Sequence, residues 1–145
     1  MKSSAWGALA LLLLTPPCLA LTKHIYGDVQ VTNISPSSDF VWERDSAQQP
    51  QYPIELARSR IAGCTVLSFD ISKTGDTENI EVINSVPNNA IGRYSRQILK
   101  EWKWTPTSTA KTAEKRTVRL DFCLGEISSA ESEKQCKQQA QLACS

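Results

Sequence analysis

The fold is decided by the stretch CTVLSFDI, residues 64–71, and by the turn SKTGD, residues 72–76, that follows it. Along this stretch small or apolar side chains alternate with others, which is typical of a strand with one buried face. The core-facing positions are Thr65, Leu67, Phe69 and Ile71. Gly75 can adopt the positive φ that a tight reversal needs, so the chain returns as a second strand through Ile80 and Val82. The two strands predict a β-hairpin.

A helix is predicted on each side of this hairpin. Before it, Pro53 suits the first turn of a helix whose apolar residues are Ile54, Ala57 and Ile61. After it, residues 90–103 predict a second helix with an apolar stripe formed by Ile91, Ile98 and Trp102. Pro106 ends this second helix, because a residue that precedes proline is pushed out of helical geometry.

A third strand and a tail complete the predicted domain. Residues 116–124 alternate, with Val118, Leu120 and Phe122 on one face, and residues 128–143 are rich in Glu, Lys and Gln and favour a tail helix. The simplest way to bury these faces is an α+β domain with a three-stranded antiparallel sheet and both helices on one side. The predicted core is Leu67, Phe69, Ile80, Val82, Ile91, Ile98, Trp102, Leu120 and Phe122.

The N-terminal residues 1–20 have the layout of a secretory signal. A short basic start is followed by an apolar run of about ten residues, and Pro16-Pro17 closes it well short of the about 20 residues that a spanning helix needs. We therefore expect export and cleavage after Ala20, with an uncleaved anchor as the alternative. Residues 21–51 form a polar leader with at most a short strand around Val29-Gln30-Val31.

The charge balance of the exported chain gives no sign of a polyanionic partner. The chain has 16 Lys and Arg and 15 Asp and Glu, and loss of Lys2 with the signal leaves 15 of each. Nucleic acids and anionic membranes select for a clustered excess of Lys and Arg, which is missing here. We therefore expect neither as a partner.

Four cysteines remain after Cys18 leaves with the signal: Cys64, Cys123, Cys136 and Cys144. An even number in a small exported chain predicts two disulfides, whereas a zinc site is disfavoured because no pair is spaced C-x-x-C and His24 is the one histidine. Two connectivities are considered. A Cys64–Cys123 bridge across strands with Cys136–Cys144 is slightly preferred, and the alternative joins each tail cysteine to a strand.

The ordered set of motifs resembles the C-terminal domain of the TonB family over about residues 52–124. The match is strongest at WKWTP, residues 102–106. The other residues that carry it are Tyr52, Pro53, Ala57, Ile61, Gly63, Phe69, Ile71, Gly75, Ile80, Val82, Pro87, Val118, Leu120 and Phe122. We therefore expect four segments: the signal (1–20), the leader (21–51), a TonB C-terminal-like domain (52–126) and a helical, cysteine-containing tail (127–145).

The resemblance implies a strand order of 2-1-3, in which the third strand lies at an edge with unpaired backbone groups. It further implies that this edge binds an extended segment of an outer-membrane receptor or envelope protein by strand addition. The implied binding residues are Arg116, Thr117, Val118, Arg119, Leu120 and Asp121. A homodimer through sheet edges is also considered. Energy-transducing members have a membrane helix and a long Pro-rich spacer, whereas residues 21–51 contain Pro36 and Pro50 alone, so we expect a free-standing periplasmic domain.

The sequence has two alternative functional interpretations. In one, the tail or residues 25–34 block the sheet edge, and the protein is a structural or regulatory envelope module that uses another surface. In the other the protein is an enzyme, which is disfavoured because the sequence has no phosphate loop, nucleophile elbow or histidine-metal motif. We expect no catalytic residue, no metal and no cofactor.

Overall fold

The computed structural model describes residues 23–45, 47–87 and 89–145. The expected signal, residues 1–20, and its cleavage point lie outside this part of the chain. The elements, in chain order, are β1 (Tyr26–Asn33), β2 (Trp42–Arg44), α1 (Ile54–Arg58), β3 (Gly63–Ile71), β4 (Thr77–Val86), α2 (Asn89–Lys100), β5 (Trp104–Pro106), β6 (Glu114–Gly125) and α3 (Ser129–Gln139).

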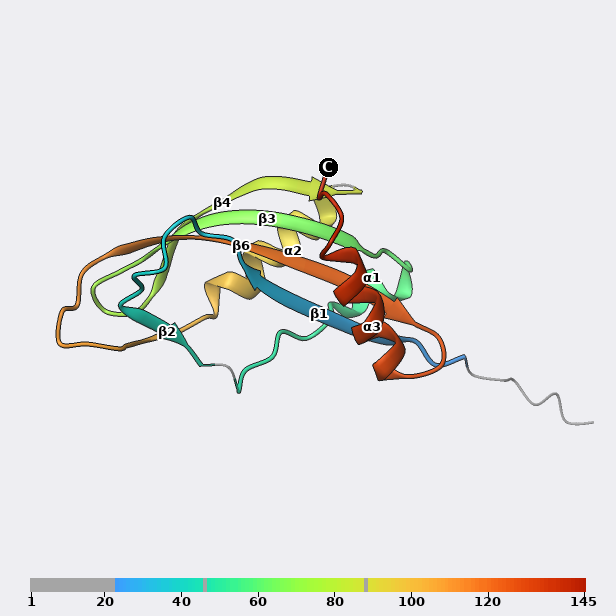
Figure 1. Ribbon diagram of the computed structural model, residues 1–145. Coiled ribbons are helices and arrows are strands. Elements are labelled where there is room, and N and C mark those ends of the chain that lie inside the picture. Colours follow the sequence, from blue (N-terminus) through green and yellow to red (C-terminus); the bar gives the residue numbers. More distant parts are fainter. Residues whose placement is uncertain (1–22, 46, 88) are drawn as a thin grey trace, which may run out of the picture.

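The main sheet has four antiparallel strands in the order β1-β6-β3-β4 (Figure 1). The three predicted strands are β3, β4 and β6, and their mutual order is the expected one. The prediction of a three-stranded sheet is nevertheless wrong, because β1 adds a fourth strand beside β6. Val29 and Val31 give β1 an apolar face toward the core, and this compensates the cost of ordering a segment that is otherwise polar.

One core lies on the α1 and α2 side of the sheet. Alternate residues of β3 and β6 join Leu56 of α1 and both Ile91 and Leu99 of α2 in a single buried cluster. Of the predicted core, Leu67, Phe69, Ile91, Trp102, Leu120 and Phe122 are buried, while Ile80, Val82 and Ile98 pack against the cluster at partial burial. Trp104, which belongs to β5, is buried as well.

Gly75 makes the predicted turn between β3 and β4. It has a φ of 83°, and an added Cβ would clash with the Trp104 carbonyl oxygen. The same approach lets the Gly75 carbonyl accept a hydrogen bond from the Trp104 amide at 3.0 Å. Glycine at this position therefore joins the hairpin turn to β5, which pairs with β2 as a separate two-stranded sheet.

Helix α3 covers the opposite face of the sheet, over β6 and β1 (Figure 1). Its Ser128 cap accepts a hydrogen bond from the Glu131 amide, and Glu131 in turn accepts hydrogen bonds from the Glu126 and Ile127 amides. Two disulfides hold this tail: Cys123–Cys136, with Cα atoms 5.4 Å apart, and Cys64–Cys144, at 5.8 Å.

The preferred Cys64–Cys123 connectivity is therefore wrong, and the alternative, in which each tail cysteine joins a strand, is the observed one. The reason is the strand register. Cys64 lies opposite Asp121, not opposite Cys123. A two-residue diagonal separates side chains by about 7–8 Å, which is too far for a disulfide. The tail helix ends at Gln139, so Cys144 is free to reach β3.

Candidate functional site

The outer edge of β6 is occupied by the chain's own N-terminal strand. β1 pairs with β6 without interruption from Tyr26 opposite Gly125 to Asn33 opposite Val118. The pairing continues past the strand end, because the Ile34 amide donates to the Thr117 carbonyl at 3.0 Å. The prediction that β6 is an edge strand with unpaired backbone groups is therefore wrong for this state of the molecule.

The six predicted binding residues divide between the two faces of β6. Val118 and Leu120 point into the core and are buried. Thr117, Arg119 and Asp121 lie at the alternate positions, and the Thr117 amide points toward β1, where it donates to Ser35 Oγ at 2.9 Å. Since strand amides alternate in direction, the amides of Arg119 and Asp121 also point toward β1. Thr117, Arg119 and Asp121 are therefore the residues whose backbone groups face β1.

Arg116 is committed to internal contacts. Its guanidinium pairs with Glu114, donates to the Trp42 carbonyl and stacks 3.7 Å from the Phe40 ring centroid. Glu114 also accepts a hydrogen bond from the Val41 amide at 2.8 Å. Arg116 thus fastens the segment before β2 to β6, and it is not a free side chain that selects a partner.

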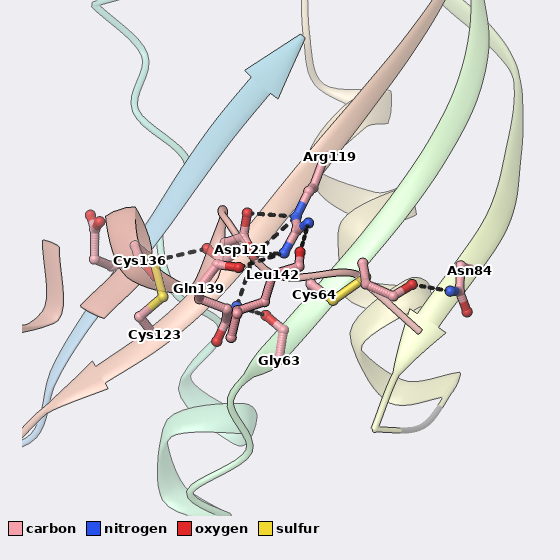
Figure 2. Close-up of polar contacts among 11 residues, drawn as sticks. Gly63, Cys64, Asn84, Arg119, Asp121, Cys123, Cys136, Gln139 and Leu142 are labelled. Atoms are coloured by element: carbon pink, nitrogen blue, oxygen red, sulfur yellow. Dashed lines mark hydrogen bonds and ion pairs between the residues drawn. A yellow bond between two sulfur atoms is a disulfide. The ribbon is translucent and has the colours of Figure 1, made fainter. Parts of the chain in front are cut away.

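Arg119 and Asp121 form a buried ion pair beneath the tail (Figure 2). Arg119 Nη2 lies 2.8 Å from Asp121 Oδ1, and Asp121 is fully buried. The same guanidinium donates to the Gln139 and Leu142 carbonyls at 2.9 and 2.6 Å, so a cation caps the C-terminal end of α3. Gln139 bridges Asp121 Oδ1 and the Gly63 carbonyl. This network secures the tail, and Arg119 is therefore not exposed to a partner.

Helix α3 forms one wall beside the β6 edge. The Cys123–Cys136 disulfide bonds it to β6, and Cys136 Sγ lies 3.8 Å from the carbonyl oxygen of Asp28 on β1. Burial under the helix raises the pKa of Asp28, and the nearby Glu133 carboxylate raises it further, against smaller opposite effects of the Val29 amide and Lys137. An acidic side chain at this place on β1 is thus poorly accommodated.

Tyr52 forms the other wall, on the core side. Its hydroxyl donates to the Ile61 carbonyl, its ring packs edge-on against Phe122 at 5.7 Å, and burial raises the pKa of its phenol. Gly27 of β1 lies against this ring, where an added Cβ would come within 2.5 Å of Tyr52 Cγ. We call the space between Tyr52, the β6 edge and α3 the β6 slot; β1 occupies it.

The opposite edge of the sheet, on β4, is irregular. Its register with β3 shifts at two places, between Val66 and Leu67 and between Ser68 and Asp70, and Asn79 has a φ of 49°. Glu78 and Glu81 are exposed along it. Bulges and outward charges are features by which edge strands resist pairing with another strand.

The remaining chemistry is sparse. Among the described residues, no group of three or more His, Cys, Asp or Glu side chains is placed to hold a metal ion. None of the helices in that part of the chain is long and apolar enough to cross a membrane. Trp102 and Trp104 are buried in the core and offer no exposed aromatic surface.

The family model for the Gram-negative bacterial TonB protein C-terminal matches residues 48–124, more than half of the 145 residues. The chain belongs to this family. Protein TonB of Escherichia coli K12 is 30% identical over 61 residues, covering 42% of this chain and 26% of the relative. Protein TonB of Salmonella typhimurium is 30% identical over 59 residues, covering 41% and 24%. The chain thus matches about a quarter of the length of these relatives.

A solved structure of the TonB C-terminal domain, the solution NMR structure from Pseudomonas aeruginosa, is similar at 25% identity with a TM-score of 0.42, covering 60% of this chain and 85% of that one. The matched family segment contains α1, β3, β4, α2, β5 and most of β6. β1 and α3 lie outside it. β1, which occupies the β6 slot, and α3, which forms one wall of it, therefore lie outside the TonB C-terminal match. Tyr52, the other wall, lies inside it.

Sequence reasoning missed the participation of Ser35 and Tyr52 in this site, and it named the β1 segment only as an alternative occupant of the sheet edge. The alternation in Val29-Gln30-Val31 was the available signal for β1, and residues 25–34 were named as one segment able to block the edge. No local pattern identified Ser35, because its contact with Thr117 joins positions 82 residues apart.

Proposed function

We propose that this chain is a periplasmic TonB-like binding protein that takes an extended segment of an outer-membrane receptor or other envelope protein onto the β6 edge at residues 116–121. Strand addition of this kind uses backbone hydrogen bonds for affinity and side-chain pockets for specificity. The observation that carries the proposal is that this edge already accepts an extended segment, β1, over eight consecutive residue pairs.

The regularity of strand pairing favours β6 over β4 as the acceptor. The β6 register with β1 has no shift, whereas the β4 strand has two and carries outward carboxylates. A homodimer through sheet edges, in which neither copy releases β1, would use the outer edge of β1 or the β4 edge. At β4 the bulges and the repulsion between like charges oppose it.

A partner segment must displace β1 in this proposal. β1 is tethered through residues 34–41, and a short tether of this kind gives an effective concentration on the order of millimolar. The partner therefore binds with an affinity reduced by the fraction of time for which the slot is empty. Binding of a partner therefore increases when the pairing of β1 with β6 is weakened.

The same eight-residue pairing favours a second function. If β1 never leaves, the chain is a structural or regulatory envelope module that uses another surface. In both proposals residues 1–20 are a cleaved export signal, the domain spans 52–126 and the tail spans 127–145. Transport drive belongs to whole TonB proteins, of which this chain matches about a quarter, and it is not proposed here.

Photo-crosslinking in living cells separates the two functions. A crosslinking amino acid is placed at Thr117, beside the β6 slot, or at Glu81 on β4, in the full exported chain. Val29→Asp puts a charge at a buried β1 position, and Asn33→Asp adds the same charge at an exposed one. We expect Thr117 crosslinks to an extended segment of an outer-membrane protein, which increase with Val29→Asp alone. Crosslinks only from Glu81, or equal yields in the two variants, would contradict strand addition at β6.

A further inference from the structure

We infer that β1 is an internal competitor whose residue pattern describes the partner: an extended segment with glycine opposite Leu124 and β-branched aliphatic residues opposite Phe122 and Leu120. This inference rests on the proposed function, because it assumes that a partner replaces β1 in the β6 slot. It adds the side-chain chemistry of the partner segment.

The two faces of β1 meet different surroundings. Gly27, Val29 and Val31 lie opposite Leu124, Phe122 and Leu120, whose even-numbered positions face the core. Asp28, Gln30 and Thr32 lie opposite Cys123, Asp121 and Arg119, on the side that α3 covers. A replacing strand must satisfy both surroundings in the same alternation, since a slip of one residue exchanges the faces.

The position of Gly27 excludes a side chain. Three atoms of Tyr52 lie within 2.8 Å of where a Cβ would stand. Tyr52 cannot easily move aside, because its hydroxyl is bonded to the Ile61 carbonyl and its ring rests on Phe122. Gly27 has an ordinary backbone conformation, so this requirement comes from the close contact and not from φ. The partner therefore needs glycine at this point.

The positions of Val29 and Val31 require aliphatic side chains. Val29 is 3% exposed and belongs to the core cluster, and Val31 packs against that cluster. Both are β-branched, which suits a pleated strand half-buried between neighbours. A charge at either position would be desolvated without a partner, so the slot selects against it.

The α3 side tolerates polar residues and disfavours a carboxylate. Asp28, Gln30 and Thr32 are each partly buried there. Glu133 on α3 repels Asp28, and Lys137 compensates only in part. A partner segment with an uncharged residue at the place of Asp28 therefore competes better than β1 itself.

The inference is tested with a fluorescent peptide of residues 24–35, HIYGDVQVTNIS, titrated against the full exported chain. The chain is used as wild type, as Val29→Asp to loosen β1, and as Asn33→Asp as the matched control. We expect the peptide to bind the Val29→Asp chain about tenfold or more tightly than either other chain, since the competitor is weakened. Gly27→Val within the chain loosens β1 by the Tyr52 contact and serves as a second, uncharged variant if Val29→Asp fails to form both disulfides.

Altered peptides give the deciding comparison. Peptides with Gly27→Val or Val29→Asp should lose at least about tenfold in affinity for the loosened chain, because the Tyr52 contact and the core pocket reject them. Equal binding of the native and altered peptides would overturn the inference. If Thr117 crosslinks to an envelope segment without this pattern, the inference fails while the proposal of strand addition stands. If neither the peptide nor an envelope segment reaches β6, the inference and the proposed function both fail.

Discussion

Ser35 Oγ accepts a hydrogen bond from the Thr117 amide at 2.9 Å, and its single proton is shared between the Thr117 carbonyl oxygen at 3.2 Å and Asn33 Oδ1 at 2.8 Å. A side-chain hydroxyl thus completes the β6 edge where the β1 backbone turns away. Thr117 uses both of its edge groups in this contact, and the Ile34 amide adds a second donor to the same carbonyl. The end of β1 is therefore fastened by a local contact that a single substitution can remove.

Replacing Ser35 by alanine should loosen β1 without unfolding the domain. Loss of a partly buried hydrogen bond costs about 1 kcal/mol, or about fivefold in an opening equilibrium. Amide hydrogen exchange of residues 29–33 should accelerate by about this factor, while β3 amides keep their rates. Ser38→Ala, at an exposed position nearby, is the control. Unchanged exchange in β1 would show that the Ser35–Thr117 contact does not hold the strand.

The docking of β1 should depend on pH through Asp28. Burial first, and Glu133 second, raise the pKa of this carboxyl in the docked strand above its value in a released one. The protonated form therefore favours docking, which strengthens as pH falls through the raised pKa and weakens as pH rises. Asp28→Asn should strengthen docking at neutral pH and remove this dependence. The measurement is β1 exchange at several pH values, corrected for intrinsic rates, with Asp39→Asn as control; the same pH dependence in Asp28→Asn would contradict the assignment.

Arg119→Ala should destabilise the protein by about 3–5 kcal/mol, because Asp121 is left as an unpaired buried charge. The sequence alone placed Arg119 among the residues that bind a partner at the strand edge. Urea unfolding measures the loss. The Arg119→Met, Asp121→Leu double variant removes both charges and should lose less than Arg119→Ala does. Equal stability of wild type and Arg119→Ala would contradict the buried pair.

The two disulfides should differ in their contribution to stability. Cys64–Cys144 spans 80 positions and Cys123–Cys136 spans 13, so the chain-entropy model assigns them about 4.5 and about 3 kcal/mol. Replacing each pair with serines and measuring urea unfolding tests this order. Peptide mapping of the unreduced protein should recover these two linkages, and recovery of Cys64 joined to Cys123 would contradict the structure.

The central sheet was predictable because its signal is local. Alternation in residues 64–71 and 116–124, the turn at Gly75 and the helical spacing after residue 90 each fix an element from neighbouring residues. Trp102 was correctly placed in the core but wrongly in the helix, because α2 ends at Lys100. Each of these patterns is formed by residues that are close together in the sequence.

The candidate site was not predictable because it depends on register and on distant partners. The disulfide pairing turns on Cys64 lying opposite Asp121 instead of Cys123, a two-residue offset that alternation cannot reveal. Arg119 looks like an exposed strand cation until the end of α3 is placed over it. β1 has two aliphatic residues on its core-facing side and becomes a strand through its pairing with β6 and the cover of α3.

The most direct test locks β1 in place. Ile34 and Thr117 are joined by a backbone hydrogen bond, and such antiparallel pairs have Cα atoms about 5.5 Å apart, within reach of a disulfide. Affinity for the residue 24–35 peptide is measured for the Ile34→Cys, Thr117→Cys chain, with linkages confirmed by mapping, and for the Ile34→Ser, Thr117→Ser control. Competition for the β6 slot predicts that the locked chain loses binding by at least about tenfold relative to the control. Equal affinity of the two chains would contradict it, because the peptide would then bind somewhere other than the edge that β1 covers.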